Sequence, residues 1–433
     1  MVVAAEVWLW DRLAGAVLWD GKEQLASFEF DQGFFRSGWD IAPITMPLRQ
    51  GKRVYAFPEI RRGRTDAFDT FRGLPGLLAD MLPDKYGNRL INAWLAQNGR
   101  PTDSLNPVEL LCFIGKRGVG ALEIKPSLRQ ESAKASSLEI ESLVGIANKI
   151  LNSREDFQTD LSKEEEAALA DILKIGTSAG GARAKAVIAF NPKTGEVKSG
   201  QVKAPAGFSH WIIKFDGVTD TQFGTSSGYG RVEMAYYLMA KEAGIQMSEC
   251  RLLEEKGRAH FMTKRFDRTE TGEKIHMQSL CGLRHFDFNQ VGVYSYEQVF
   301  ETMRMLRLTY PEAEQQFIRM VFNVLARNCD DHTKNFAFLM DQSGKWSLSP
   351  AYDVCHAFRP GSLWVSSQSL TVNGKRNQIT ETDFLEVARQ MNIKKPQEKI
   401  EQVKLAVKKW SSFADEVRVE PKLRDSIQAT LLA

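Results

Sequence analysis

The sequence predicts an α+β protein in two parts, a β-rich N-terminal lobe and a helical C-terminal lobe. Three observations support this fold class. Short segments of alternating or continuous apolar residues fill positions 7–30, a polar stretch poor in apolar residues occupies 126–136, and strongly amphipathic segments with a helical period follow position 311. We therefore place a boundary near residue 130, with an N-terminal β-rich and helical subdomain at 1–130 and a core at 131–433.

The N-terminal part begins with strands and then becomes helical. Expected strands are 7–10, 14–19 and 28–30. From 71 to 95 the apolar spacing is helical, and Pro83 divides it into two helices, with Asp84 as the N-cap of the second. A further short apolar helix is expected at 108–114.

The core begins with mixed elements. Ser136 and Glu139 form a capping-box pattern before an apolar helix. The expected elements are a helix at 138–150, a charged helix at 161–174, a small-residue loop that leads into a strand at 175–190, and a strand at 210–215. A polar loop at 219–230 and a helix at 231–243 follow.

The end of the core is helix, hairpin and helices. Pro311 starts a helix whose apolar residues recur at i, i+3, i+4, i+7 and i+8 up to Leu325. Strands at 336–340 and 346–348 flank a turn, and helices follow from about residue 381. Because a hairpin brings the chain back to its starting point, residues on either side of it are expected to lie close together.

Composition limits the function classes. The 433 residues carry 57 Lys and Arg against 54 Asp and Glu, so no overall positive field predicts direct nucleic-acid binding, although Arg61-Arg62-Gly63-Arg64 is a local cluster. Five scattered cysteines without a C-x-x-C pair indicate reduced thiols and a cytoplasmic protein. We expect no signal peptide, and no run of about 18 apolar residues predicts a membrane span.

One motif indicates chemistry. Asp330 and Asn335 have the five-residue spacing of a protein-kinase catalytic loop, in which the Asp accepts the proton of the substrate hydroxyl and the Asn binds magnesium. Asp353, in the loop after the predicted hairpin, is placed as the second metal ligand. Asp331 is an alternative base, and the spacing to Asn335 favours Asp330.

Three further segments fit nucleotide binding, each with a plain structural alternative. The small residues before Lys185 let backbone N–H groups approach a phosphate, but a tight hairpin without a ligand uses the same residues. Lys214 at the end of a strand suits the α- and β-phosphates, or is a surface residue. Glu233 either pairs with Lys214 or simply favours the positive end of its helix. Residues 264–266 lie where a kinase hinge would bind adenine.

The order of these parts resembles the HipA-like serine/threonine kinase toxins of type II toxin–antitoxin systems. The resemblance is carried by Ser178–Lys185, the Lys214 strand, Lys264–Arg268, Asn328–Asn335 with Ala351–Asp353, and, in the N-terminal part, Phe71–Asp84. It implies a two-lobed, divergent protein-kinase-like fold. The usual kinase signatures G-x-G-x-x-G-x-V, V-A-I-K, H-R-D, D-F-G and A-P-E are missing, which argues against a standard eukaryotic-type kinase and for the divergent family.

The resemblance also implies residue roles. Asp330 is the proton acceptor, Asn335 and Asp353 bind Mg²⁺, and Ser178 is the autophosphorylation site that switches the enzyme off. ATP binding is implied for Gly180, Gly181, Ala182, Arg183, Ala184, Lys185, Lys214, Lys264, Arg265, Phe266, His332, Thr333, Lys334, Asn335, Tyr352 and Asp353.

Partners follow from the resemblance alone. It implies a helix-turn-helix-type antitoxin dimer, operator DNA reached through that complex, the bacterial cytoplasm, and protein substrates of the aminoacyl-tRNA synthetase class. Three alternatives stay open: a small-molecule phosphotransferase, a catalytically weak corepressor, and a hydrolase whose metal cluster uses Asp330, Asp331, His332 and Asp353.

Overall fold

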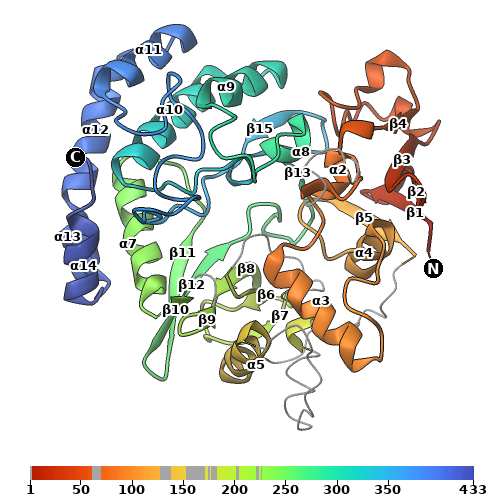
Figure 1. Ribbon diagram of the computed structural model, residues 1–433, viewed down its shortest axis with the longest axis horizontal. Helices are drawn as coiled ribbons and strands as arrows, with labels where there is room; N and C mark the ends of the chain where they lie inside the picture. The colour runs from red at the N-terminus through yellow and green to blue at the C-terminus, as the bar shows by residue number, and fades with distance from the viewer. Residues whose placement is uncertain are drawn as a thin grey trace.

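A computed structural model describes the fold (Figure 1), which combines antiparallel sheets with helices packed around them. The two chain ends lie on opposite sides of the molecule. None of the helices described here is long and apolar enough to cross a membrane. The residues described are 2–60, 70–126, 138–152, 171–173, 176, 183–200, 204–220, 224–225 and 227–433.

The N-terminal part is a five-stranded antiparallel sheet in the order β4-β3-β2-β1-β5. Its strands alternate buried and exposed residues, and Gly15 lets β2 approach β3 so closely that a Cβ there would lie 2.2 Å from the Glu29 carbonyl oxygen. The strands are β1 (Ala4–Leu9), β2 (Arg12–Asp20), β3 (Leu25–Phe30), β4 (Val54–Ala56) and β5 (Leu122–Lys125).

Among the helices that accompany this sheet in the described part of the chain are α2 (Gly76–Ala79), α3 (Lys85–Gln97) and α4 (Pro107–Ile114). Asp84 caps α3 as predicted, since its Oδ1 accepts a hydrogen bond from the Gly87 N–H at 2.7 Å. Short 3₁₀ turns are η1 (Phe34–Arg36), η2 (Leu48–Gln50), η3 (Pro58–Ile60) and, later in the chain, η4 (Thr333–Asn335).

A second antiparallel sheet forms the middle of the molecule, in the order β11-β12-β8-β6-β7. Helix α5 (Ile140–Asn152) shares an apolar cluster with β6 and β8, while α7 (Tyr229–Glu242) packs against β11 and β12 (Figure 1). The strands are β6 (Lys185–Phe190), β7 (Val197–Ser199), β8 (Ser209–Lys214), β11 (Cys250–Glu255) and β12 (Arg258–Lys264).

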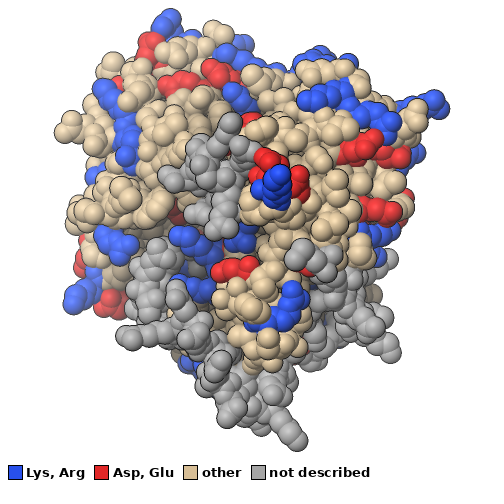
Figure 2. Space-filling model, turned by 45° about the vertical axis from the view of Figure 1, so that its right-hand side comes forward, with Lys and Arg blue, Asp and Glu red and all other residues tan. Residues whose placement is uncertain are grey.

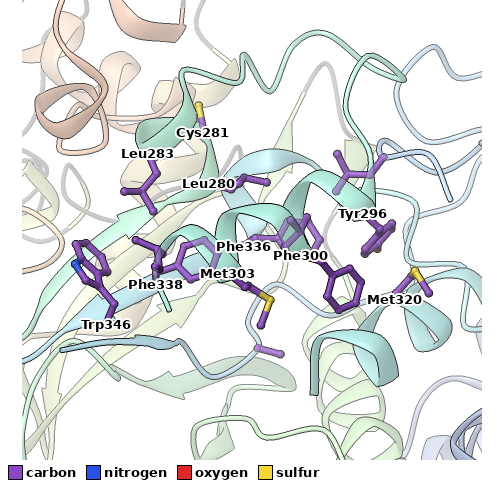
Figure 3. Packing of buried hydrophobic residues seen from close by; sticks show 14 of the residues in the cluster. Leu280, Cys281, Leu283, Tyr296, Phe300, Met303, Met320, Phe336, Phe338 and Trp346 are labelled. Carbon is purple, nitrogen blue, oxygen red and sulfur yellow. The ribbon is translucent and has the colours of Figure 1, made fainter. Parts of the chain in front are cut away.

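The C-terminal part is mainly helical around a third sheet, β13 (His276–Ser279), β14 (Ala337–Met340) and β15 (Trp346–Leu348). Side chains from this sheet and from the neighbouring helices meet in one apolar core (Figure 3). The helices are α8 (Leu280–Arg284), α9 (Tyr296–Met305), α10 (Tyr310–Leu325), α11 (Glu381–Met391), α12 (Pro396–Lys408), α13 (Trp410–Glu416) and α14 (Pro421–Gln428).

Most predicted elements are present. The helix predicted from Pro311 is α10, which starts with a capping box at Thr309 and has Pro at its first turn. The loop expected at 219–230 contains a short hairpin of β9 (Thr219–Asp220) and β10 (Gly224–Thr225). The helix predicted at 161–174, the cap at Ser136 and the Arg61–Arg64 cluster lie wholly or largely outside the described residues.

Hydrogen bonds fasten the N-terminal part to the core. Both Asp80 carboxylate oxygens accept from Ser279, one from its N–H and one from its Oγ, each at 2.7 Å. Nε2 of His285 accepts from the Gly76 N–H at 3.0 Å, and Trp10 Nε1 donates to the Lys274 carbonyl at 2.7 Å. The N-terminal part is therefore positioned against the core by specific polar contacts as well as by apolar packing.

Acid should weaken this junction through His285. Burial lowers the pKa of His285 to about 4, below the value of roughly 6.5 expected in the unfolded chain. Between those two values the unfolded state binds the extra proton, so stability falls as pH falls from 6.5 towards 4. We expect His285→Asn to lose less stability than the wild type between pH 7.5 and 5, by about 2 kcal/mol. Urea unfolding at both pH values measures this difference, and equal losses would contradict it.

Candidate active site

A lysine held between two carboxylates marks the centre of the site. Strand β8 ends at Lys214, helix α7 supplies Glu233, and the loop after β15 supplies Asp353. The Lys214 Nζ lies 2.7 Å from Glu233 Oε2 and 2.6 Å from Asp353 Oδ1. Of the two alternatives for Glu233, the structure therefore shows the pairing with Lys214.

Charge balance sets the protonation of this trio. Burial would lower the pKa of Lys214, but the two adjacent carboxylates outweigh it and raise that pKa above its ordinary value. Burial would likewise raise the pKa of Asp353, but Lys214 and Lys185 hold it at about 2. Near neutral pH the site thus presents charged groups of both signs.

The loop after α10 presents Asp330 to solvent. Its side chain is 51% exposed, and His332 Nε2 lies 3.9 Å from its Oδ1. Asn335 Nδ2 donates to the Asp330 backbone carbonyl at 2.7 Å, which closes the loop on itself. This contact orients the Asn335 amide so that its oxygen remains available as a ligand.

Asp331 has a different environment. It is buried, and its carboxylate accepts hydrogen bonds from Tyr296 Oη at 2.7 Å, from Gln368 Nε2 at 3.0 Å and from the Ser369 N–H at 2.6 Å. Burial raises the pKa of Asp331 to about 6. The described contacts give Asp331 a structural role under the loop and leave Asp330 as the accessible carboxylate.

Both loops of the site are tied together. The Tyr352 hydroxyl donates to the Lys334 carbonyl at 2.6 Å, and the Cys329 N–H donates to the Ala357 carbonyl at 3.1 Å. The C-terminal residues add a third support: Arg327 Nε donates to the Thr430 carbonyl at 3.0 Å, and the Leu432 N–H to that of Leu325 at 2.9 Å.

The donor set suits magnesium. Mg²⁺ binds oxygen ligands and is commonly held by one or two carboxylates together with substrate phosphates. Asp353 offers a carboxylate and Asn335 an amide oxygen. The Asp353 backbone has φ 51°, a left-handed conformation that costs energy in a non-glycine residue and is often found at functional sites. In the described part of the chain, no group of three His, Cys, Asp or Glu side chains forms a metal cluster.

The phosphate-loop prediction is described only at its end. Ser178, Gly180, Gly181 and Ala182 lie outside the described residues. Arg183 lies with its guanidinium carbon 4.3 Å from the Tyr229 ring centroid, and Ala184 is buried. Lys185 faces Lys214 across the strand pair, and its Nζ lies 3.8 Å from Asp84 Oδ2.

Several other predicted residues have established contacts. Lys264 makes a solvent-exposed ion pair with Glu270 at 2.7 Å, whereas Arg265 makes a buried ion pair with Asp267 at 2.6 Å. No hydrogen bond from another described residue reaches the Phe266 backbone. The centroid of the Phe266 ring lies 5.4 Å from that of the Tyr352 ring.

Residues 332–334, predicted to bind ATP, divide into one buried residue and two that are partly exposed. Thr333 is buried, and its hydroxyl donates to the Phe286 carbonyl at 2.8 Å, so it supports the loop. His332 and Lys334 both lie against the Phe288 ring and remain partly exposed.

On the face of the molecule shown in Figure 2, Lys and Arg side chains gather near the middle, with acidic side chains beside them.

A cavity of about 20 Å³ lies beneath the loops, enough for a single water molecule. It is lined mostly by polar side chains, among them Arg319, Asn323, Asn328, Asp331, Asn335 and Tyr352. A cavity of this size is too small to hold a nucleotide.

Sequence reasoning missed the partners of two site residues. Tyr296, Gln368 and Ser369 hold Asp331 from distant parts of the chain, and no local pattern points to them. Asp84 was predicted only as a helix cap, but its second oxygen faces Lys185. Its position beside Pro83 gives no signal for that contact.

The fold and the charged site define a two-part α+β protein with the architecture of a solved toxin. HipA of Shewanella oneidensis MR-1, determined in a complex with HipB and operator DNA, matches with a TM-score of 0.66 and 15% identity over 98% of this chain and 94% of that chain. At this identity the match shows a shared fold.

Family models identify the chain further. Residues 5–125 match the HipA N-terminal domain, and residues 177–410 match the HipA-like C-terminal domain, so the chain belongs to the HipA family. The Helicobacter pylori proinflammatory kinase CtkA matches weakly, with a TM-score of 0.30 and 14% identity over 51% of this chain and 90% of that chain. No curated protein matches the sequence.

Proposed function

We propose that this protein is an ATP- and Mg²⁺-dependent serine/threonine protein kinase that acts as a growth-arresting toxin. The observation that carries the proposal is the contact of Lys214 with both Glu233 and Asp353. In protein kinases, a strand lysine paired with a helix glutamate holds the α- and β-phosphates next to an aspartate that binds magnesium.

The roles follow from these positions. Asp330 accepts the proton of the substrate hydroxyl, and Asn335 and Asp353 hold Mg²⁺, which neutralises charge on the transferred phosphoryl group. Lys185, Lys214, His332 and Lys334 bind phosphates, and the backbone of Phe266 binds adenine. The contacts of Lys264, Arg265 and Thr333 favour supporting roles for their side chains.

The toxin role and its partners rest on family membership. We expect the chain to bind an antitoxin dimer, as the Shewanella HipA is found with HipB and operator DNA, and to act in the bacterial cytoplasm on a substrate of the aminoacyl-tRNA synthetase class. The alternative is a small-molecule phosphotransferase, because it would use the same Asp330, Asn335 and Asp353.

Mass spectrometry of phosphopeptides separates these functions. After incubation of the purified protein with Mg-ATP, we expect phosphate on Ser178, and none when magnesium is chelated. A phosphate on Ser178 would add about −1.5 to −2 charges to the proposed phosphate loop and so repel ATP, which gives the off-switch. An unmodified Ser178 together with a labelled soluble metabolite would favour the small-molecule alternative.

A further inference from the structure

The two oxygens of Asp84 have different surroundings. Oδ1 caps helix α3 by accepting from the Gly87 N–H at 2.7 Å. Oδ2 is buried, has no hydrogen-bond partner among the described residues, and lies 3.8 Å from Lys185 Nζ. Capping helix α3 requires only Oδ1, and the negative charge on Oδ2 attracts the Lys185 ammonium group.

Lys185 lies in the middle of the charged site. Its side chain is only 3% exposed, and it is the direct cross-strand neighbour of Lys214. Directly opposed residues of an antiparallel pair lie on the same face of the sheet, so the side chains of Lys185 and Lys214 extend from the same face. Among the described residues, charged groups that act on Lys185 include Asp84, Asp353 and Glu233 with opposite sign and Lys214 with like sign.

Asp84 comes from the N-terminal part, whereas Lys185, Lys214 and Asp353 belong to the core. The N-terminal part is held firmly against the core by the contacts of Asp80 and His285. The Asp84 carboxylate is therefore a fixed negative charge at the edge of the site.

We propose that Asp84 belongs to the nucleotide site as an internal counter-anion, which competes with the phosphates of ATP for Lys185 and so sets the nucleotide affinity. The inference rests on the proposed function. Phosphates that approach Lys185 must replace its attraction to Asp84 and also overcome their own repulsion from that carboxylate. Both effects act over a few ångströms in a poorly solvated region, where charges interact strongly.

The test compares the wild type with Asp84→Asn. Asparagine caps helices as well as aspartate does, so this variant keeps the α3 cap and removes only the charge. We expect Asp84→Asn to bind Mg-ATP more tightly, by roughly fivefold, and to bind adenosine, which lacks phosphates, with unchanged affinity. Calorimetric titration with each ligand gives both constants, and thermal melting of Asp84→Asn beside Asp84→Ala checks that the cap is retained.

A second background tests whether the effect passes through Lys185. In Lys185→Met, the competition no longer exists, so the gain from Asp84→Asn should shrink. Equal gains in both backgrounds, or an unchanged affinity for Mg-ATP in Asp84→Asn, would overturn the inference while leaving the proposed function intact. A wild-type protein that binds no Mg-ATP would contradict the proposed function and this inference with it.

Discussion

Asp330→Asn should lose phosphoryl transfer by roughly 10²- to 10⁴-fold, because asparagine cannot accept the proton of the attacking hydroxyl. The change is nearly isosteric, and the side chain it replaces is half exposed. Thermal stability and Mg-ATP affinity should therefore stay close to the wild-type values. The rate of phosphate incorporation into Ser178, measured with labelled ATP, gives the loss.

Asp331→Asn is the matched control for this prediction. The amide NH₂ of the new asparagine would face Tyr296, Gln368 or Ser369, which already donate hydrogen bonds to Asp331. Two donors facing each other without an acceptor in a buried place cost about 1–3 kcal/mol of stability. The two substitutions should thus have different effects: Asp330→Asn lowers the rate of phosphoryl transfer, and Asp331→Asn lowers the free energy of unfolding. Full activity of Asp330→Asn would contradict the assignment of the base.

Gly230→Ala should destabilise the protein by ~3 kcal/mol, since overpacking forces the backbone to move. A Cβ at Gly230 would lie 1.9 Å from the Ala259 carbonyl oxygen, so helix α7 would have to move away from strand β12. Glu233 lies one turn further along the same helix, so its contact with Lys214 should weaken as well. Urea unfolding and the phosphorylation assay measure the two effects.

Gly145→Ala serves as the control for Gly230→Ala. Gly145 lies in the middle of α5, and nothing lies within 4 Å of a Cβ at that position. Replacing a helical glycine in open space stabilises by about 0.5–1 kcal/mol through lower chain entropy. A similar loss of stability in both variants would show that crowding at Ala259 is not the cause.

The sequence predicted what depends on local patterns. The helical period before Leu325 gave α10, and the hairpin after Asn335 placed Asp353 beside the Asp330 loop, as the Tyr352 contact with Lys334 reflects. The capping role of Asp84 was also local, because an acidic residue after proline at a helix start has a clear physical reason.

The remaining contacts depend on packing between distant segments. Helices α8 and α9 were not predicted. Helix α8 has only five residues, too few to show a period. Helix α9 does carry a local signal, since a capping box at Ser295 precedes apolar residues at i, i+3, i+4 and i+7, and its side chains pack in the apolar core (Figure 3). The pairing of Glu233 with Lys214 was one of two open alternatives, and only the register of β8 against β12 and the seating of α7 decide it. The contact of Asp84 with Lys185 spans two parts of the chain and has no sequence signal.

The attachment of the last residues beside the Asp330 loop affects how the protein should be handled. Thr430 contacts Arg327 just before that loop and His356 just after Asp353, while Leu432 reaches back to Leu325. An affinity tag or fluorescent protein fused behind Ala433 would therefore disturb the segments just before Asp330 and just after Asp353. A fusion ahead of strand β1, which lies on the opposite side of the molecule (Figure 1), would avoid these contacts.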